Sequence, residues 1–347
     1  MLEVRTLSDG GQQASEVAAW IAEFVGAARR TLDLAQYDFH LLPETAAVVC
    51  GALRAARDRG VAVRLIYNVD HPNPIPVPPP PEPDVALIAS LGLPARAIAG
   101  VPDLMHHKYA IRDDEAVWTG SMNWTDDSFT HQENVVAEIE SPELAQGFSL
   151  DFEHLWETGD VLTGGTTEPR RTHVDGVVVR AWFTPGFGEE LSQRIATVIG
   201  RAKRRVRICS PVITTGPVLG TLAQAIDDGR LDVAGCVDQT QMQEVVHQWR
   251  ANGNVTWKLP LLLRVAADHR FRGKRSTAWR PEGSLHDFMH AKVTVADDHV
   301  FLGSFNLSRS GEKNAENMVE IRSEELADRL AGYVDEVRAR YPDLELS

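Results

Sequence analysis

The chain has 347 residues, of which 43% are hydrophobic and 24% are charged, and its formal net charge is −14. This length accommodates two domains of ordinary size, and the composition is typical of a globular protein with a full hydrophobic core. The acidity disfavours a protein that binds nucleic acid through a broad basic face, although it is compatible with a local basic groove.

Signals for membrane insertion and secretion are not found in the sequence. No run approaches the roughly 18 consecutive apolar residues of a transmembrane helix. The opening segment MLEVRTLSDGG lacks the basic start and apolar core of a signal peptide, so we expect a cytoplasmic protein. The cysteines Cys50, Cys209 and Cys236 are scattered among apolar residues, which favours buried free thiols over a disulfide framework or a zinc site.

The first half begins as an alternation of strands and helices. An extended segment from Val4 precedes a helical stretch whose apolar face is formed by Val17, Ile21, Phe24 and Val25. Residues 31–37, TLDLAQY, are predicted to form a strand. Residues 53–70, LRAARDRGVAVRLIYNVD, predict a helix, a glycine stop and a second strand.

A proline-rich segment, HPNPIPVPPPPEP at residues 71–83, follows that strand. Its prolines exclude a helix or a central strand and favour an extended loop. We expect a surface loop near the mouth of a site, because a strand ends directly before it. A docking motif for a proline-reading domain is the alternative.

The second half repeats this pattern. The segment from Val179 again contains an extended stretch, a glycine turn and a helix with a basic end. The strand and the helix–strand unit recur in residues 206–212 and 222–238. The apolar face of the repeated helix is formed by Leu191, Ile195, Val198 and Ile199.

Each half closes with a further helix, in residues 138–156 and 320–341. Strands that alternate with helices predict an α/β fold with largely parallel or mixed sheets. We assign the first half to residues 1–160, a linker rich in Gly, Thr and charge to residues 161–176, and the second half to residues 177–347.

The halves also share a polar motif. The first copy, in residues 106–123, consists of His106, Lys108, Asp113, Gly120, Ser121 and Asn123, and Glu133 lies downstream. The second copy, in residues 290–306, consists of His290, Lys292, Asp297, Gly303, Ser304 and Asn306, and Glu316 lies downstream. Side chains two apart on a strand share a face, so each histidine is predicted to lie beside its lysine. A hairpin would bring the Ser-x-Asn pair next to them.

These residue types suit chemistry at phosphorus. Lysine ammonium and asparagine amide groups are donors for nonbridging phosphate oxygens, and a serine hydroxyl adds another donor. A histidine can act as a nucleophile or as a general acid and base near neutral pH. Two copies related by approximate twofold symmetry would place a histidine on each side of one phosphorus, as in-line displacement requires.

The doubled motif resembles the HKD motif of the phospholipase D superfamily, over both halves of the chain. The resemblance implies two pseudo-symmetric α/β/α sandwich halves with one active site at their interface. It also implies a metal-independent reaction, without a cofactor, through a covalent phosphohistidine. By resemblance His106 is the nucleophile and His290 the acid and base, although the symmetry of the sequence leaves this order open.

The remaining motif residues receive roles from the same resemblance. The residues expected to neutralise charge on the phosphoryl oxygens are Lys108, Lys292, Asn123 and Asn306. Those expected to contact the substrate are Ser121 and Ser304. The carboxylates expected to accept a hydrogen bond from a histidine ring nitrogen are Glu133 and Glu316, with solvated charges as the alternative. Structural parts of the motif are Gly120 and Gly303, together with Asp113 and Asp297, which would form salt bridges.

A basic segment, RVAADHRFRGKRSTAWR at residues 264–280, precedes the second motif. It would line a cleft for an anionic substrate, with Arg270 and Arg272 as binding residues and Trp257 and Trp279 as stacking groups. A solvated charged face is the alternative.

We therefore predict an enzyme that hydrolyses or transphosphatidylates a phospholipid or related phosphodiester, with peripheral membrane contact. The acidity favours this substrate over nucleic acid, which a nuclease would pass through the basic segment 264–280. An inactive binding module that retains the fold is a third alternative, which the two intact motifs disfavour. Because both motifs lie in one chain, a monomer is expected.

Overall fold

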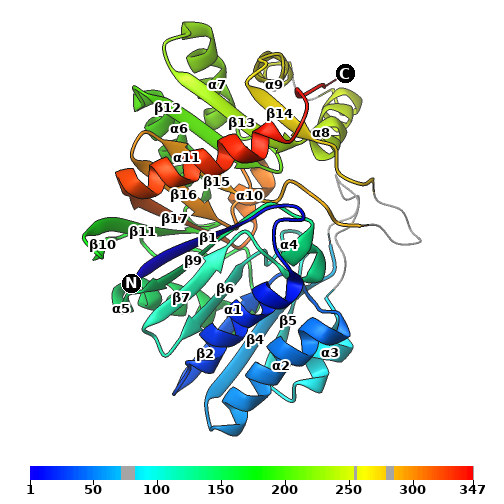
Figure 1. Ribbon diagram of the computed structural model, residues 1–347, viewed down its shortest axis with the longest axis vertical. Coiled ribbons are helices and arrows are strands. Elements are labelled where there is room, and N and C mark those ends of the chain that lie inside the picture. The colour runs from blue at the N-terminus through cyan, green and yellow to red at the C-terminus, as the bar shows by residue number, and fades with distance from the viewer. Residues whose placement is uncertain (72–82, 254–255, 279–284, 347) are drawn as a thin grey trace.

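The computed structural model describes residues 1–71, 83–253, 256–278 and 285–346. Two α/β halves lie one above the other along the long axis of the molecule, the first half blue to green and the second green to red (Figure 1). The predicted fold class is thereby confirmed. Residues 72–82 of the proline-rich segment, and Trp279, lie outside the described ranges.

The first half contains nine strands and five helices in the described ranges. In chain order they are β1 (Leu2–Leu7), α1 (Ala14–Gly26), β2 (Thr31–Gln36), β3 (Phe39–His40), α2 (Pro43–Asp58), β4 (Ala62–Val69), α3 (Val85–Ser90), β5 (Ala95–Ala99), β6 (Lys108–Arg112), β7 (Ala116–Gly120), β8 (Trp124–Thr125), α4 (Asp126–Thr130), β9 (Asn134–Glu140) and α5 (Pro142–Thr158).

The second half follows the same order with a few additions. Its elements are β10 (Arg171–Val174), β11 (Val177–Thr184), α6 (Gly188–Arg201), β12 (Arg205–Ser210), α7 (Gly216–Asp228), β13 (Asp232–Asp238), α8 (Gln239–Ala251), α9 (Lys258–Ala266), β14 (Phe271–Lys274), β15 (Val293–Ala296), β16 (His299–Gly303), α10 (Arg309–Lys313), β17 (Glu316–Arg322) and α11 (Glu324–Ala339).

Each half is built on one mixed sheet. The strand order is β1-β9-β7-β6-β2-β4-β5 in the first and β10-β11-β17-β16-β15-β12-β13-β14 in the second. Without β10 the two orders correspond strand for strand, so the repeat in the sequence is also a repeat of topology. In both sheets the three strands at one edge are parallel and the others are antiparallel.

The boundary between the halves differs from the predicted one. Residues 171–174, assigned to the linker, form β10 and pair with β11. Thr172 and Val174 are buried there, whereas Arg171 and His173 are exposed. Buried and exposed residues alternate along this strand, as in an edge strand. The strand was not predicted because its exposed Arg171 and His173 lie in a segment that is rich in charge. The connection between the halves is therefore shorter, at residues 159–170.

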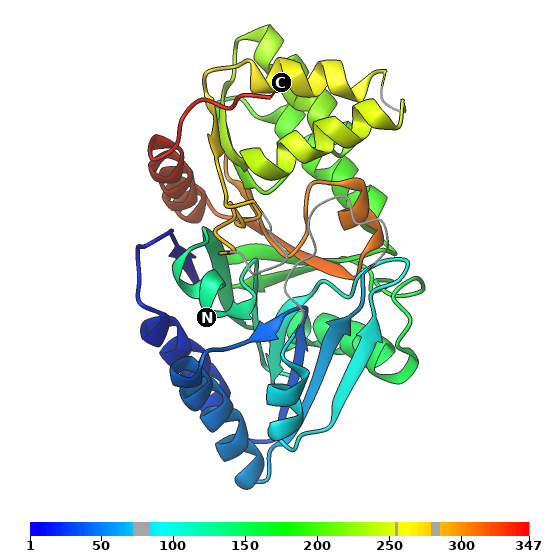
Figure 2. The same cartoon turned by 90° about the vertical axis from the view of Figure 1, so that its right-hand side faces the viewer.

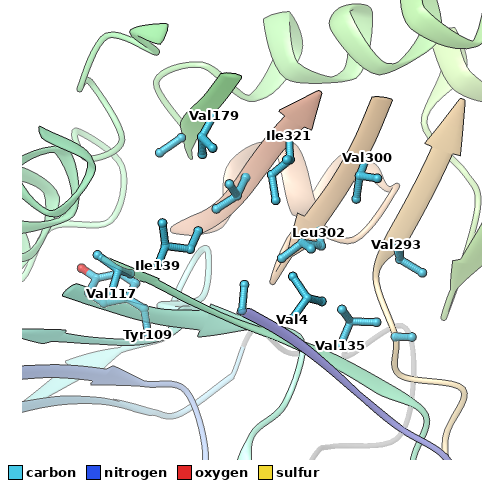
Figure 3. Close-up of a cluster of buried hydrophobic side chains, with 14 of the residues drawn as sticks. Val4, Tyr109, Val117, Val135, Ile139, Val179, Val293, Val300, Leu302 and Ile321 are labelled. Carbon is cyan, nitrogen blue, oxygen red and sulfur yellow. The ribbon is translucent and has the colours of Figure 1, made fainter. Parts of the chain in front are cut away.

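Three clusters of buried apolar side chains form the core. One lies between the first sheet and helices α1 and α2, and another between the second sheet and helices α6 to α9. The central cluster joins both sheets with α5 and α11. Side chains of the two sheets point toward one another there, as Figure 3 shows for Tyr109 and Val117 opposite Ile321 and Val179. The burial of this apolar surface holds the two halves together.

The predicted helix faces are part of these clusters, since all eight named residues of α1 and α6 are buried. The outer helices cover the two sheets on the sides away from the shared interface, as the side view in Figure 2 shows. No helix of the described ranges has both the length and the apolar character needed to cross a membrane.

The motif aspartates Asp113 and Asp297 lie in the turns of the two motif hairpins, with φ values of 57° and 52°. Aspartate tolerates this left-handed conformation better than most residues. The Asp113 carboxylate accepts hydrogen bonds from the backbone N–H groups of residues 29, 30 and 31, at 3.0, 2.6 and 3.0 Å. Asp297 accepts the equivalent bonds from residues 203, 204 and 205, at 2.8, 2.9 and 3.1 Å. Backbone groups therefore replace the expected salt bridges.

Replacing Asp113 with alanine is expected to lower the free energy of unfolding by about 2 kcal/mol, because three backbone donors lose their acceptor. Burial raises the pKa of this carboxyl, but the N–H donors outweigh it and the pKa is lowered. Its stabilisation is therefore present above the ordinary carboxyl pKa and is lost as the pH falls. Urea unfolding measures the change. The control is Asp114→Ala, since the Asp114 carboxylate accepts a hydrogen bond from the Ser149 hydroxyl, a side-chain donor. If both variants lost the same free energy of unfolding, the backbone hydrogen bonds to Asp113 would not explain the effect.

Candidate active site

The site lies where the halves meet, at the carboxyl ends of β2 and β12. His106 enters β6, whose first residue, Lys108, pairs with Gln36 at the end of β2. The backbone N–H of His106 donates to the carbonyl oxygen of Ala315, at 2.8 Å, which ties the strand entry to the opposite half. Nδ1 of His106 then lies 2.8 Å from Oε2 of the fully buried Glu316. A hydrogen bond from Nδ1–H to this carboxylate leaves Nε2 available for chemistry.

His290 occupies the equivalent position but has a different partner. Its Nδ1 lies 3.1 Å from Oδ1 of Asn134. The orientation of this amide follows from its other bonds, because Oδ1 accepts from the Ser121 hydroxyl at 2.7 Å and Nδ2 donates to the carbonyl oxygen of Ser128 at 3.2 Å. Nδ1 of His290 is therefore the protonated nitrogen in the neutral ring, and its Nε2 is also left available.

The expectation that Glu133 would accept a bond from a histidine is not met. Met289 pairs with Glu133 across the interface, so His290 faces the next residue, Asn134. Glu133 is fully buried, and its Oε2 lies 2.9 Å from Nζ of Lys274. Glu316, by contrast, lies at hydrogen-bond distance from the ring of His106, as expected.

The motif lysines are almost completely buried, at 1% exposure for Lys108 and 2% for Lys292. Each Nζ donates to the carbonyl oxygen of the histidine two residues before it, at 2.8 Å. Burial lowers the pKa of Lys108 to about 7. Burial and the charge of Lys108 lower the pKa of Lys292 well below its usual value. An anion that binds beside these buried lysines would stabilise their charged forms, so the site favours an anion.

Burial also lowers the pKa of both histidines, and the two lysine charges lower it further. His106 and His290 are therefore uncharged in the free site, as a nucleophile must be. Burial raises the pKa of Glu316 to about 7, against the opposing charge of Lys108. A bound phosphodiester anion would offset the lysine charges, raise the pKa of the histidines and allow one of them to carry a proton.

The asparagines of the motif have capacity to bind a ligand. Asn123 is 8% exposed, and within the described ranges the Oδ1 atoms of Asn123 and Asn306 have no hydrogen-bond partner. Buried polar atoms are usually paired, so these two unpaired oxygens within the motifs are available to a donor from a ligand. An unpaired amide oxygen accepts a hydrogen bond, so the predicted contact to phosphoryl oxygens would have to come from the Nδ2 donors of these amides.

The motif serines do not line the site. Ser121 and Ser304 are fully buried, and their hydroxyl oxygens accept from the backbone N–H groups of Val135 and Asn317, both at 3.0 Å. The prediction that they contact substrate is therefore corrected: they tie β7 to β9 and β16 to β17. The preceding glycines allow this approach, because a Cβ on Gly120 would lie 2.2 Å from a carbonyl oxygen of β9. For Gly303 the corresponding distance to β17 is 2.3 Å.

The described arginines and lysine of the basic segment, within residues 264–278, are paired with carboxylates, contrary to the prediction of a substrate cleft. Arg270 pairs with Asp268 at 2.7 Å, and Arg272 pairs with Asp343. The remaining described pairs of the segment are Arg264–Asp227, Lys274–Glu133, Lys274–Asp9 and Arg275–Glu345. In the described part of the chain, neither Arg270 nor Arg272 contacts the histidine cluster. Asp268 lies within the segment, but the partners Asp227, Asp343 and Glu345 lie elsewhere in the sequence and could not be identified from the run of basic residues.

From the sequence, a contact of Tyr37, Asp38 and His40 with substrate is only a guess, based on their place at the end of a predicted strand. The Tyr37 ring lies 4.5 Å from the His106 ring, and Nζ of Lys108 lies 4.7 Å from the Tyr37 ring centre. Burial raises the pKa of Asp38 to about 8. The available signal was their position directly after β2, since polar residues at the carboxyl ends of parallel strands gather at one edge. Over the described ranges, no group of three or more His, Cys, Asp or Glu side chains is arranged to hold a metal.

Comparison with known proteins agrees with this arrangement. The family model described as "Cardiolipin synthase, PLD-like domain" matches residues 21–156 and 195–338. The human mitochondrial cardiolipin hydrolase is 28% identical over 147 residues, which are 42% of this chain and 54% of the relative. For the hydrolase of Chlamydomonas reinhardtii the identity is 27% over 135 residues, covering 39% and 55%. The chain spans about half the length of the curated relatives it matches.

Two solved structures share the fold over nearly the whole chain. Phosphatidylserine synthase from Haemophilus influenzae Rd KW20 has a TM-score of 0.65 at 12% identity, covering 97% of this chain and 86% of its own. Polyphosphate kinase from Porphyromonas gingivalis has a TM-score of 0.57 at 12% identity, covering 96% and 46%. The family model covers most of both halves and contains both motifs. The chain therefore belongs to the phospholipase D superfamily of phosphodiesterases and phosphatidyltransferases.

Proposed function

We propose that this chain is a phosphodiesterase that cleaves a phospholipid or related diester through a covalent phosphohistidine, without a metal. The observation that carries the proposal is the pair His106 and His290. They come from opposite halves, each has its Nδ1 fixed by a side chain of the other half, and buried Lys108 and Lys292 lie beside them. Such a site can attack phosphorus from one side and protonate the leaving oxygen on the other.

The reaction has two displacements. Nε2 of His106 attacks phosphorus with its lone pair, the bond from phosphorus to the leaving oxygen breaks, and that oxygen takes a proton from Nε2 of His290. Water or an alcohol then gives a proton to His290 and attacks phosphorus. The phosphorus–nitrogen bond breaks, and its electron pair returns to His106. The products are the alcohol and a phosphomonoester, or a new diester when an alcohol replaces water.

The surrounding side chains stabilise the charges that develop. Lys108 and Lys292 neutralise the equatorial phosphoryl oxygens, which is worth several kcal/mol in a site shielded from water. The Glu316 carboxylate, 2.8 Å from Nδ1 of His106, stabilises the positive imidazole ring of the phosphohistidine.

A phospholipid is favoured over nucleic acid as substrate. The curated relatives are named cardiolipin hydrolases, and a structural neighbour is a phosphatidylserine synthase. The described cations of the segment 264–280 are paired with carboxylates, and the whole chain carries a net charge of −14. A duplex or single strand needs several unpaired cations along its backbone.

Vesicles of phosphatidylglycerol or cardiolipin are expected to be cleaved to phosphatidic acid, with bis(p-nitrophenyl) phosphate as a soluble reporter. Activity should be unchanged by excess EDTA, because lysines take the role of a metal, and added ethanol should yield phosphatidylethanol. Mass spectrometry of the lipid products measures both. Inactivity on all three diesters, or loss of activity on chelation, would contradict the proposal.

Single-stranded DNA is the competing substrate, and salt distinguishes it. A nuclease should bind DNA strongly at 50 mM salt and lose affinity steeply by 200 mM, because phosphate contacts release counterions. We expect little binding at either concentration. Cleavage of DNA that His106→Ala abolishes would replace the lipid as substrate while keeping the chemistry.

A further inference from the structure

The two motif histidines have chemically different partners. His106 faces the carboxylate of Glu316, whereas His290 faces the amide of Asn134. In the aligned repeats Glu133 is the equivalent of Glu316, so the second contact lies one residue further along the strand. A displacement of one residue on a strand exchanges the side chain that points at a given neighbour. The halves are therefore symmetric in fold but not in the acceptor that each histidine receives.

Lys274 accounts for the position of Glu133. Its Nζ lies 2.9 Å from Oε2 of Glu133 and 3.1 Å from Oδ2 of Asp9, and it donates to the carbonyl oxygen of His131 at 2.9 Å. The Tyr341 hydroxyl donates to the other Glu133 oxygen. Lys274 is 3% exposed and Glu133 is fully buried. A buried carboxylate held by a cation and a hydroxyl is strongly retained, because its release would leave an uncompensated charge.

In the described part of the first half, an isoleucine occupies the place of this lysine. Lys274 pairs with Asp238 between β14 and β13, and Ile98 pairs with Asn68 between β5 and β4. Asp238 and Asn68 are equivalent, since each side-chain oxygen accepts the backbone N–H of the residue before its own motif histidine, both at 3.0 Å. The buried Ile98 thus occupies the place of Lys274. An apolar residue there cannot hold a carboxylate, and Glu316 remains with His106.

We propose that Lys274 is a positioning residue that retains Glu133 in an ion pair, leaves His290 with a neutral amide, and so assigns the nucleophile to His106 and the acid and base to His290. This assignment rests on the proposed function. A carboxylate behind His106 stabilises the positive ring of a phosphohistidine. An amide behind His290 stabilises its charged form less, so the ring gives up its proton more readily to the leaving oxygen.

The proton affinity of His290 tests this role without any assay of activity. The other charged and titratable groups that face His290 are Lys292, Lys108, His106 and His286. Carbon-13 labelled histidine allows each ring to be followed by NMR as the pH changes. In Lys274→Met the ion pair is lost, and the carboxylate of Glu133, whose neighbour Asn134 contacts His290, is left without its cation. The midpoint of His290 is then expected to rise by about one pH unit, while Lys274→Arg keeps it unchanged.

Two further variants separate positioning from general damage. The double variant Lys274→Met with Glu133→Gln removes both charges and should return the His290 midpoint to that of the parent. Arg207→Met removes a buried guanidinium that pairs with the more exposed Asp232 and Asp335 in the second half, and it should not move the His290 midpoint. If Lys274→Met does not fold, Lys274→Gln takes its place, with the same expected rise.

An unchanged His290 midpoint in a folded Lys274→Met, or a raised one in the double variant, would overturn the proposal. Failure of the proposed function has a different signature. The chain would then cleave no diester and form no phosphohistidine, whatever the NMR midpoint shows. Cleavage with an unmoved midpoint removes only the role of Lys274.

Discussion

His106→Ala is expected to lower turnover of phosphodiesters by about 10⁴-fold or more, the order found when a covalent nucleophile is removed. Without Nε2 of His106 no phosphohistidine can form, and water would have to attack the diester directly. The lysines and asparagines remain, so binding of the substrate should change far less than kcat.

His290→Ala should behave differently with an activated substrate. The p-nitrophenolate ion leaves without needing a proton, so the first displacement on bis(p-nitrophenyl) phosphate does not depend on a general acid. The second displacement needs His290 as a base. We therefore expect a burst of up to one p-nitrophenolate per chain, followed by near arrest, and a phosphohistidine at His106 in the trapped protein.

Stopped-flow absorbance and peptide mass spectrometry measure the burst and the modified residue. His173→Ala is a matched control, since His173 is exposed on β10. It should show normal turnover. A burst in His106→Ala and none in His290→Ala would reverse the two roles, and a burst in neither would argue against a covalent intermediate.

The two-half architecture could be predicted because the repeat appears at several levels of the sequence. The helix faces of α1 and α6 follow the helical period and are buried as expected. The alternation before and after Asp113 and Asp297 predicts two hairpins, and the hairpins bring each lysine beside its histidine. Local periodicity determines these features, so one sequence suffices for them.

Features that depend on contacts between the halves could not be predicted in this way. The difference between Glu316 and Glu133 depends on a one-residue displacement at the interface and on Lys274, which lies outside both motifs. Similarly, Arg270 and Arg272 lack a role at the site because acidic residues pair with them in the folded chain. Motif membership indicates which residues meet, whereas the hydrogen-bond partner of each depends on tertiary register.

Lys108→Met and Lys292→Met are each expected to lower kcat by about 10²- to 10³-fold, because charge on the phosphoryl oxygens develops next to them. The effect on KM should be smaller. Arginine should not restore activity at either position, since both lysines are almost completely buried and a planar guanidinium does not fit the place of an ammonium. Lys313→Met, at an exposed position in α10, serves as the control and should leave kcat unchanged.

The same lysines predict that an anion binds together with protons. The pKa of Lys108 is about 7, so this lysine is largely uncharged at pH 8 in the free site. An anion stabilises the charged form and raises the pKa of Lys108, and it also raises the pKa of Glu316, which is about 7. Both pKa values rise, so both groups bind more protons when the anion is bound. Binding therefore takes up protons at pH 8, and by linkage the affinity falls as the pH rises above about 7.

Sulfate is a suitable probe, because it mimics a phosphate diester and has no proton of its own in this range. Titration calorimetry at pH 8 in two buffers of different ionisation enthalpy measures the protons taken up per sulfate bound. We expect net uptake in the parent chain and a smaller uptake in Lys108→Met. Proton release, or an affinity for sulfate that is constant from pH 6 to 9, would mean that the buried lysines keep their charge in the free site. The charged lysines would then lower the pKa of both histidines in the free site as well as in the complex.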